Sequence, residues 1–359
     1  MDLFEEIKCD GYEQVLVFSD AASGLEAIIA IHSTRLGPAL GGCRMWPYPS
    51  FDMAMRDVLR LSKAMTYKAA MSDLPLGGGK AVIVGDPRTD KTEPLMLAFA
   101  KQVGSLAGRY IVAEDVGIGM ADIELFRRVT PHVAGFKQEA GGTGDPSPST
   151  ALGVFYGMRA CLEEVFGNPS FAGRRVAIQG MGKVGYALAK LLHQESANLI
   201  ISDMDPERVA SGCRDFDADP IHPHEIYRVD CDLFAPCAMG GILNERTIPA
   251  LSCKIVAGSA NNQLEDDHAA TALQKRGILY APDYLINAGG LIQVARYPAL
   301  AGRQEQDRNA VTDQKIKKIY HRLKEIFFMA RANGMPPSDA ADCMAEQKLS
   351  QQRQKETTA

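Results

Sequence analysis

A glycine-rich turn, Gly180-Met-Gly-Lys-Val-Gly185, is the first group of residues whose types and spacing could carry chemistry. It directly follows an expected strand, Arg175–Gln179, and it opens an expected helix. In such a turn the first glycine allows a tight bend, the second lets phosphate approach the backbone, and the third lets the helix pack closely on the strand. The helix N-terminus adds unpaired N–H groups and the positive end of its dipole. The turn therefore predicts a pyrophosphate site formed by Gly180, Met181, Gly182, Lys183, Val184 and Gly185.

An acid at the end of the next expected strand strengthens this interpretation. Asp203 closes Leu199-Ile-Ile-Ser-Asp, about 20 residues after the turn, as a dinucleotide-binding unit requires. Its carboxylate would accept hydrogen bonds from the adenosine ribose and repel a 2′-phosphate. We therefore expect NAD as the cofactor, with NADP a poor substitute. The alternative is a glycine turn that merely packs a helix.

Two lysines in the N-terminal half form the second group. Lys68 follows an expected helix, Phe51–Met65, which Ser50 caps, and Lys80 lies between Leu76-Gly-Gly-Gly79 and an expected strand, Ala81–Val84. The glycines would let the backbone approach a ligand and aim the lysine. A lysine beside another cation in a partly dry cleft has a lowered pKa and can act as a base. Two solvated surface lysines remain the alternative.

The third group is a pair of acids at the end of an apolar stretch, Ile111-Val-Ala-Glu-Asp-Val-Gly117. Acids that follow a strand at its carboxyl end project to the edge where open α/β sheets bind ligands. Either Glu114 or Asp115 could move protons, and either could instead cap the next helix. The residues themselves leave both possibilities open.

The elements that must position these groups follow from hydrophobic patterning. From residue 174 onward, short apolar runs alternate with amphipathic stretches, which indicates a parallel sheet covered by helices on both faces. The runs are Val176–Ile178, Leu199–Ile201, Leu233–Ala235, Ile255–Ala257 and Ile278–Ala281. The N-terminal half mixes strands such as Glu26–His32 with helices. We therefore expect an α/β protein with two domains around a cleft, a mixed α/β substrate domain and a doubly wound dinucleotide-binding domain.

Composition excludes several other classes of function. The chain has 359 residues and a formal net charge of −5, which provides no basic field for nucleic acid or anionic lipid. Its apolar runs are far shorter than the roughly 20 residues of a membrane-spanning helix. Eight scattered cysteines without a CxxC pair predict neither a disulfide framework nor a metal site. We expect a cytoplasmic protein with no nucleic-acid or membrane partner.

Taken in order, these and several further motifs resemble the amino-acid dehydrogenase family that acts on glutamate, leucine, phenylalanine and valine, and most of all its leucine branch. The resemblance spans roughly residues 12 to 296. It rests on Gly37-Pro-Ala-Leu-Gly-Gly-Cys-Arg44, Lys68, Leu74-Pro-Leu-Gly-Gly-Gly-Lys80, Ala113-Glu-Asp115, Gly144-Asp-Pro-Ser-Pro-Ser-Thr150, the Gly180 turn, Ala257-Gly-Ser-Ala-Asn-Asn-Gln263 and Asn287-Ala-Gly-Gly290. It implies reversible oxidative deamination of an L-amino acid to its 2-oxo acid and ammonia.

The resemblance also implies a role for individual residues. Lys68 would bind the substrate carboxylate, with help from the backbone around Gly41 and Gly42. Lys80 would be the general base that activates the water attacking the imine, and Asp115 would shuttle protons. The residues that would flank the nicotinamide are Thr150 and Asn262, and Asn262 would also approach the substrate.

Substrate choice depends on the positions that match the family's side-chain pocket, which are Leu40, Ala113, Leu291 and Val294. Glutamate-specific members carry a lysine and a hydroxyl residue there, whereas Leu40 and Val294 offer the distal carboxylate no partner. We therefore expect leucine, valine or isoleucine as substrate. Leucine-type members usually have valine where this chain has Leu291, and one added methylene could shift the substrate preference. The alternative is a phenylalanine or tryptophan dehydrogenase, which would require the helix that contains Leu291 to lie further back. A non-catalytic NAD-binding sensor is a further one.

The expected domains are a substrate domain over residues 1–135 and a dinucleotide-binding domain over 136–330. The segment 331–359 is expected to pack back on the first domain. The family forms symmetric assemblies, so we expect a homo-oligomer here.

Overall fold

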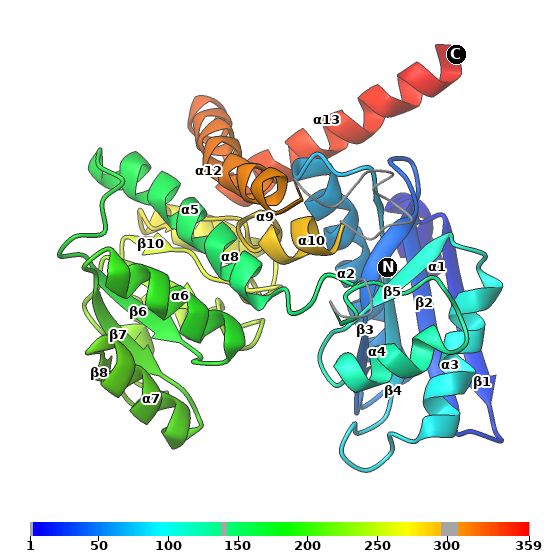
Figure 1. Cartoon of the computed structure of the whole chain (residues 1–359). Helices are drawn as coiled ribbons and strands as arrows, with labels where there is room; N and C mark the ends of the chain where they lie inside the picture. Colours follow the sequence, from blue (N-terminus) through cyan, green and yellow to red (C-terminus); the bar gives the residue numbers. More distant parts are fainter. Residues whose placement is uncertain (1–2, 138–141, 296–307, 359) are drawn as a thin grey trace. The chain divides into compact units, whose positions relative to one another are not determined.

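The structure is a computed structural model that describes residues 3–137, 142–295 and 308–358. It divides into two compact units. The first comprises Met1–Asp145, Val294–Arg303 and Glu346–Ala359, and the second comprises Pro146–Gln293 and Gln304–Ala345. Each unit contains its own sheet (Figure 1).

The sheet of the first unit has five strands in the order β1-β2-β4-β3-β5. Strands β3, β4 and β5 run parallel to one another, and β1 and β2 are antiparallel to their neighbours. The unit is thus a mixed α/β domain, as the sequence predicts, and its sheet combines parallel and antiparallel strands. The strands are β1 (Gln14–Asp20), β2 (Leu25–Ser33), β3 (Ala39–Trp46), β4 (Gly77–Val84) and β5 (Tyr110–Ala113).

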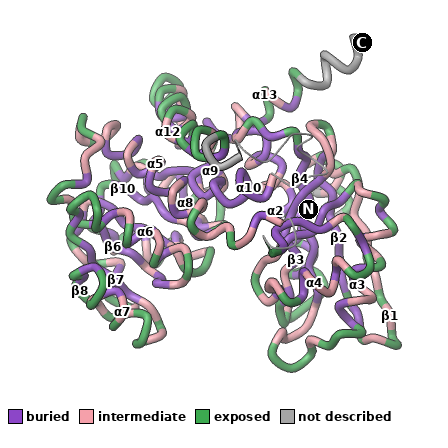
Figure 2. The backbone as a smooth tube through the Cα atoms, in the orientation of Figure 1, coloured by how far each residue is buried: buried purple, intermediate pink, exposed green. Residues whose placement is uncertain are grey.

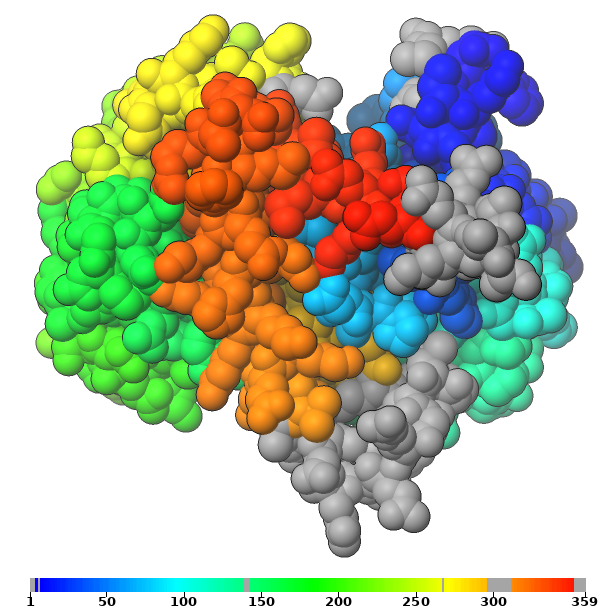
Figure 3. Space-filling view, turned by 90° about the horizontal axis from the view of Figure 1, so that it is seen from above, coloured from blue at the N-terminus to red at the C-terminus, as the bar shows by residue number. Residues whose placement is uncertain are grey.

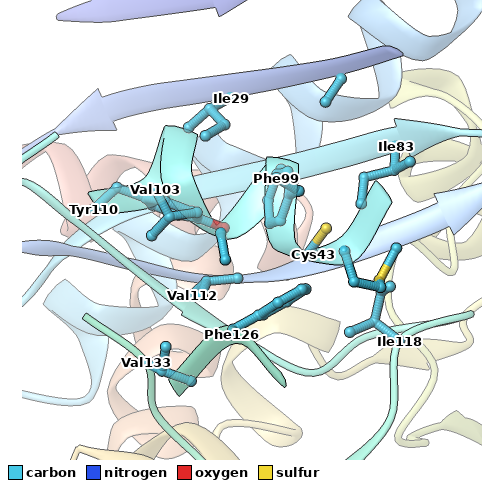
Figure 4. Close-up of a cluster of buried hydrophobic side chains, with 14 of the residues drawn as sticks. Ile29, Cys43, Ile83, Phe99, Val103, Tyr110, Val112, Ile118, Phe126 and Val133 are labelled. Carbon is cyan, nitrogen blue, oxygen red and sulfur yellow. The ribbon is translucent and has the colours of Figure 1, made fainter. Parts of the chain in front are cut away.

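Helices cover both faces of this sheet, which explains why every residue of β2 except Glu26 is buried. On one face, Ile29 and Ile31 join a core that includes Phe99 and Phe126, from helices α3 (Glu93–Ser105) and α4 (Met120–Arg127) (Figure 4). On the other face, Ile28 packs with the helix α2 (Phe51–Met71). Strand β2 is therefore buried on both sides, whereas edge strand β1 is partly exposed (Figure 2). The unit also contains α1 (Leu3–Cys9).

The expected helix Phe51–Met65 is correct at its start and wrong at its end. The Ser50 side chain accepts a hydrogen bond from the backbone N–H of Met53, as predicted for an N-cap. The helix continues to Met71, because Tyr67 and the residues from Ala69 to Met71 extend its buried face. Lys68 therefore lies within α2 and does not follow it.

The glycine run was also placed incorrectly. Gly77–Gly79 form the first part of strand β4, so this strand begins before the expected Ala81. They pair with β2 and β3 within the sheet. Their small size serves the packing of other elements on the strand, as described below for Gly78.

The second unit has a six-stranded parallel sheet in the order β11-β10-β9-β6-β7-β8. Counted along the chain, these strands give the order 3-2-1-4-5-6, which is that of the Rossmann dinucleotide-binding fold. The order reverses between β6 and β9, the point where such sheets bind their ligands. The strands are β6 (Arg175–Gln179), β7 (Asn198–Ser202), β8 (Asp219–Pro220), β9 (Leu233–Pro236), β10 (Ile255–Val256) and β11 (Leu279–Tyr280).

Helices of the second unit connect and cover these strands. Helix α5 has Pro148 in its first turn and ends at Phe166. Gly167 follows directly and adopts a left-handed conformation with φ of 68°, which suits a glycine at a helix C-terminus. Helix α12 packs along α5, and Figure 3 shows its outer side chains in orange beside the green of α5. The helices are α5 (Ser147–Phe166), α6 (Lys183–Gln194), α7 (Pro206–Phe216), α8 (Asp267–Lys275), α9 (Asp283–Ile286), α10 (Gly289–Val294), α12 (Arg308–Asn333) and α13 (Pro337–Thr358), with short 3-10 turns at Ile226–Arg228 and Ile248–Ala250.

Two of these helices contribute to both units. Val294 at the end of α10 and the part of α13 from Glu346 onward belong to the first unit. Within that unit, Glu346 accepts a hydrogen bond of 2.8 Å from the hydroxyl of Tyr67, and Lys348 donates to the carbonyl of Ala70. Over the described residues, no helix is long and apolar enough to cross a membrane.

Candidate active site

The first unit contains a buried lysine–aspartate pair. Lys80 lies on β4 and Asp115 follows β5, and Lys80 Nζ contacts Asp115 Oδ2. The two side chains are only 5% and 9% exposed. Strand β3 lies between these strands in the sheet, so the pair assembles at one end of a parallel β4-β3-β5 segment.

The surroundings of Lys80 change its acidity. Burial lowers the pKa of Lys80 to about 7, and the positive charges of Arg44 and Lys68 add to the shift. The contact with the Asp115 carboxylate opposes it, because an anion stabilises the ammonium form. A lysine in this position can exchange a proton near neutral pH, which a solvated lysine cannot do readily.

Lys68 approaches this pair because α2 lies directly on β4. A Cβ at Gly78 would overlap the backbone of Thr66, so glycine is required for the helix to come this close. Lys68 and Lys80 each lie two residues beyond this contact, on α2 and β4 respectively. Helix packing therefore explains why residue 78 is glycine. The same packing brings the ammonium groups of Lys68 and Lys80 near each other.

Asp115 is held through both of its oxygens. Oδ2 contacts Lys80, and Oδ1 accepts a hydrogen bond of 2.6 Å from the backbone N–H of Val116. Gly42 on β3 leaves room for this side chain, because a Cβ there would lie 2.8 Å from Cβ of Asp115. Of the two acids in the motif, Asp115 is thus the one that contacts Lys80.

The neighbouring backbone of β3 is fixed by a buried tyrosine. The hydroxyl of Tyr110 donates to the carbonyl of Gly41 at 2.8 Å and lies 3.3 Å from the carbonyl of Gly42. Its ring covers Gly79, where a Cβ would lie 2.8 Å from the ring. This tyrosine was not identified from the sequence, where it is one of several aromatic residues before an apolar strand.

Arg44 is a second residue that sequence reasoning missed. It lies on β3 two positions after Gly42, on the same face of the strand, and its Nε is 3.6 Å from Asp115 Oδ1. Its Nη1 donates to Asp57 on α2 at 2.9 Å. The Gly37–Arg44 motif contained a signal, because a charged residue in an otherwise apolar strand needs a partner.

Leu40 and Ala113, two of the expected pocket residues, lie on neighbouring parallel strands of this unit. Gly42 on β3 pairs in register with Ala113 on β5, and Leu40 pairs with Ile111. The side chains of Leu40 and Ala113 are both buried. Leu40 thus lies on the strand that also contains Gly41 and Gly42, and Ala113 lies on the strand beside it.

In the second unit, the backbone of the glycine turn suits a dinucleotide phosphate. Gly180 has φ of 101°, a left-handed conformation that favours glycine, and a Cβ at Gly185 would overlap the carbonyl of Gly180. A Cβ at Gly182 would meet nothing closer than Arg208 Nη1 at 3.8 Å. Helix α6 begins at Lys183, and no side chain caps its N-terminus, which is the end of a helix that attracts an anion.

Asp203 follows β7 at the same edge of the sheet. Its Oδ2 accepts a hydrogen bond of 2.7 Å from the backbone N–H of Met181 within the turn, and Oδ1 accepts one of 2.9 Å from that of Asp205. A carboxylate has about four acceptor positions, so each oxygen can still bind a ribose hydroxyl. Arg208 Nη1 lies 3.8 Å from Oδ2.

The other expected site residues of this unit occupy distinct segments. Thr150 lies in the first turn of α5, where a Cβ at Gly290 would contact its hydroxyl, so α10 begins against it. Asn262 adopts a left-handed conformation with φ of 50°, and its carbonyl accepts a hydrogen bond from Gly241. Leu291 and Val294 lie on α10 and are buried. Among the described residues, no three His, Cys, Asp or Glu side chains gather as a metal site would require.

The Rossmann strand order, the open glycine turn and the acid after β7 together define the second unit as a dinucleotide-binding domain of the type used by oxidoreductases. The comparisons with known families agree. Residues 12–132 match the model "Glu/Leu/Phe/Val dehydrogenase, dimerisation domain", and residues 141–206 and 204–356 match "Glutamate/Leucine/Phenylalanine/Valine dehydrogenase". The chain belongs to the Glu/Leu/Phe/Val dehydrogenase family, a family of amino-acid dehydrogenases that use a nicotinamide cofactor.

Individual relatives cover nearly the whole chain. A leucine dehydrogenase of Geobacillus stearothermophilus is 48% identical over 353 residues, which are 98% of this chain and 95% of that protein. A valine dehydrogenase of Streptomyces virginiae is 46% identical over 352 residues, 96% of this chain and 95% of that protein. The crystal structure of L-tryptophan dehydrogenase from Nostoc punctiforme superposes with a TM-score of 0.80 at 42% identity, covering 98% of this chain and 99% of that one. The family and its leucine branch, expected from the motifs, are confirmed.

Proposed function

We propose that this protein catalyses the reversible, NAD-dependent oxidative deamination of an aliphatic L-amino acid: leucine, valine or isoleucine. The amino acid, NAD⁺ and water give the 2-oxo acid, ammonium, NADH and one proton. The observation that carries the proposal is the buried contact between Lys80 and Asp115, with Lys68 close by. Dinucleotide binding alone needs no such arrangement of lysines and acid. The presence of this arrangement therefore argues against a non-catalytic sensor.

Lys68 binds the substrate carboxylate in this proposal. An ammonium group is a compact charge with three donors, which suits a carboxylate. The backbone around Gly41 and Gly42 helps to hold the same group, and the Tyr110 hydrogen bond to Gly41 keeps that backbone in place. The substrate Cα is thereby fixed, as hydride transfer requires.

Lys80 acts as the general base. The bound nicotinamide supplies the hydride acceptor, and loss of hydride from Cα leaves an imine on the substrate. Neutral Lys80 takes a proton from the water that attacks the imine carbon. The attack forms a carbinolamine, and Asp115 passes the proton that Lys80 took up to the carbinolamine nitrogen through Oδ2, the oxygen that contacts Lys80. Lys80, neutral again, accepts the proton of the carbinolamine hydroxyl as the C–N bond breaks. Ammonia departs and the 2-oxo acid remains.

The second unit binds NAD in this proposal. The pyrophosphate lies on the turn from Gly180 to Gly185, and the ribose hydroxyls bind Asp203. Thr150 and Asn262 flank the nicotinamide, and Asn262 also approaches the substrate. The charge of Asp203 disfavours the 2′-phosphate of NADP.

The substrate side chain contacts Leu40, Ala113, Leu291 and Val294 in this proposal. These residues are all apolar, so burying the distal carboxylate of glutamate against them would cost free energy without compensation. The similarity to L-tryptophan dehydrogenase favours a second candidate, an enzyme of the same family that prefers tryptophan or phenylalanine.

A substrate panel tests the assignment. We expect initial rates of NADH formation to give kcat/KM for L-leucine, L-valine or L-isoleucine at least tenfold above the value for L-glutamate, L-phenylalanine and L-tryptophan. If kcat/KM for L-phenylalanine or L-tryptophan were more than tenfold higher than that for L-leucine, the second candidate would be established. No NADH formation with any amino acid would contradict catalysis altogether.

We further propose that the enzyme is a homo-oligomer of the cytoplasm. The first family model is described as a dimerisation domain, which supports self-association. All eight cysteines are free, as in a reducing compartment. In the proposed division of labour, residues 1–135 bind the substrate, residues 136–330 bind NAD, and the segment 331–359 packs on the substrate domain.

A further inference from the structure

We propose that Arg44 is a positioning residue for the acid–base pair: its guanidinium, anchored by Asp57 on α2, holds the Asp115 carboxylate in place and puts a permanent positive charge beside Lys80. This inference rests on the roles proposed above for Lys80 and Asp115. It adds a residue to which the sequence motifs assign no role.

The contacts of Arg44 show a guanidinium shared between two carboxylates. On one side, Nη1 donates to Asp57 Oδ2 at 2.9 Å, and the hydroxyl of Tyr48 donates to the same oxygen at 2.5 Å. On the other side, Nε lies 3.6 Å from Asp115 Oδ1. The side chain is 19% exposed, so water screens these charges only in part. Asp57 and Tyr48 therefore fix the outer end of the guanidinium and direct its Nε toward Asp115.

The Nε–H group has spare hydrogen-bonding capacity. It is buried and has no hydrogen-bond partner among the described residues. Asp115 Oδ1 already accepts the Val116 N–H at 2.6 Å, and a small movement of the carboxylate toward Arg44 would add the second donor. Negative charge on Asp115 is then stabilised at Oδ1. This leaves Oδ2, which contacts Lys80, as the oxygen that exchanges protons.

The same guanidinium acts on Lys80 through its charge. The groups that face Lys80 are Arg44 and Cys43 from β3, Lys68 and Asp57 from α2, and Asp115 after β5. Arg44 and Lys68 lower the pKa of Lys80, whereas Asp57 and Cys43 raise it. Arginine stays protonated at all physiological pH values, so its contribution is constant. Arg44 thus increases the fraction of Lys80 that is neutral, even though Asp115 favours the ammonium form.

The test compares the titration of Lys80 in several full-length variants without relying on turnover. Trace acetylation by acetic anhydride, carried out across a pH series and read for the Lys80 peptide by mass spectrometry, reports the neutral fraction of this amine. We expect Arg44→Met to raise the Lys80 pKa by about one unit. Arg44→Lys keeps the positive charge and should therefore change the Lys80 pKa much less. Asp57→Asn removes a negative charge and should lower the Lys80 pKa. The control, Arg88→Met, removes an exposed charge of the same unit that pairs with Asp86, and should change nothing.

Steady-state kinetics provide the second readout. In Arg44→Met the rise of kcat/KM with pH should move upward together with the labelling curve. The kcat should fall while KM for the amino acid changes less than threefold, because Lys68 is intact. Tyr48→Phe, which loosens Asp57 without altering charge, should lower kcat with little change in the Lys80 pKa.

The outcomes separate this inference from the proposed function. If Arg44→Met leaves the labelling curve of Lys80 unchanged, the role of Arg44 is overturned, even if Lys80 proves to be the base. If Arg44→Met does not fold, the labelling curve of Asp57→Asn decides in the same way. If the labelling curves shift as expected but removal of Lys80 leaves turnover intact, the electrostatic effect of Arg44 stands and the proposed mechanism fails.

Discussion

A lysine side chain in water holds its proton up to a pH of about 10.4, so it is a poor base at neutral pH. Lys80 differs because it is only 5% exposed and has Arg44 and Lys68 as neighbours. Burial alone disfavours the ammonium form of Lys80, whereas contact with the Asp115 carboxylate favours it. At the scale of single residues, the site therefore depends on a balance of opposing charges in a place that water hardly reaches.

Asp203 allows a prediction at the same scale. In Asp203→Asn the side chain keeps its shape but loses the charge that repels a 2′-phosphate. Arg208, 3.8 Å from Asp203, then has one carboxylate fewer beside it, although it still pairs with Asp205 at 3.3 Å. We expect the ratio of kcat/KM for NADP to that for NAD to rise at least about tenfold, which corresponds to about 1.4 kcal/mol. Initial rates with both cofactors measure this ratio.

The matched control for this prediction is Asp230→Asn. Asp230 is an exposed carboxylate of the same unit that pairs with Arg175 on the surface, so its removal changes the net charge equally. The ratio should stay at the wild-type value in this variant. An unchanged ratio in Asp203→Asn as well would show that this acid does not discriminate between the cofactors.

At the scale of elements, the decisive feature of the first unit is the close contact between α2 and β4. It explains Gly78, where a Cβ would overlap Thr66 of α2, whereas Gly77 leaves room for the backbone of Ser33 and Gly79 for the ring of Tyr110. Patterning predicted both elements but not their extent or their contact. The buried face of α2 continues past Met65, and a glycine run is equally consistent with a loop.

Gly78→Ala tests this contact. The added Cβ would overlap the backbone nitrogen of Thr66, which no rotamer change can relieve. We expect the free energy of unfolding to fall by about 1–3 kcal/mol or more, because the helix must move off the strand. Activity of the folded variant should also fall, since the distance between Lys68 and Lys80 depends on this contact. Urea unfolding and steady-state rates measure the two effects.

Gly104→Ala is the control substitution. Gly104 lies inside α3, where a Cβ would make ordinary contact with Thr130 at 3.5 Å. Alanine favours a helix over glycine by up to about 1 kcal/mol, so stability should stay the same or increase. If Gly78→Ala were as stable and as active as this control, close packing of α2 on β4 would not be what the glycine provides.

At the scale of the whole molecule, each unit has its own sheet and its own share of the chemistry. The second unit was predictable almost strand by strand, because a parallel sheet buried on both faces produces short, fully apolar runs such as Ile200 and its neighbours. Strand β8 was missed, since it has two exposed residues, one of them proline. The Arg44–Asp57 contact was beyond sequence reasoning, because it depends on how α2 lies against β3.

The central claim, that Lys80 is the base of an amino-acid deamination, is tested most directly by the pH dependence of kcat/KM for L-leucine in the wild type and in Lys80→Ala. Deamination needs the neutral amine, whose fraction rises with pH through a pKa of about 7. The wild-type value should therefore rise with pH and level off above about 7. The reverse amination needs the protonated amine and should decline over the same range.

In Lys80→Ala we expect kcat/KM to fall by a factor of about 10² to 10⁴, the usual contribution of a general base, with NADH binding retained as measured by fluorescence. The rise with pH should also disappear. A variant that turns over L-leucine within tenfold of the wild type, with the same pH profile, would contradict the account.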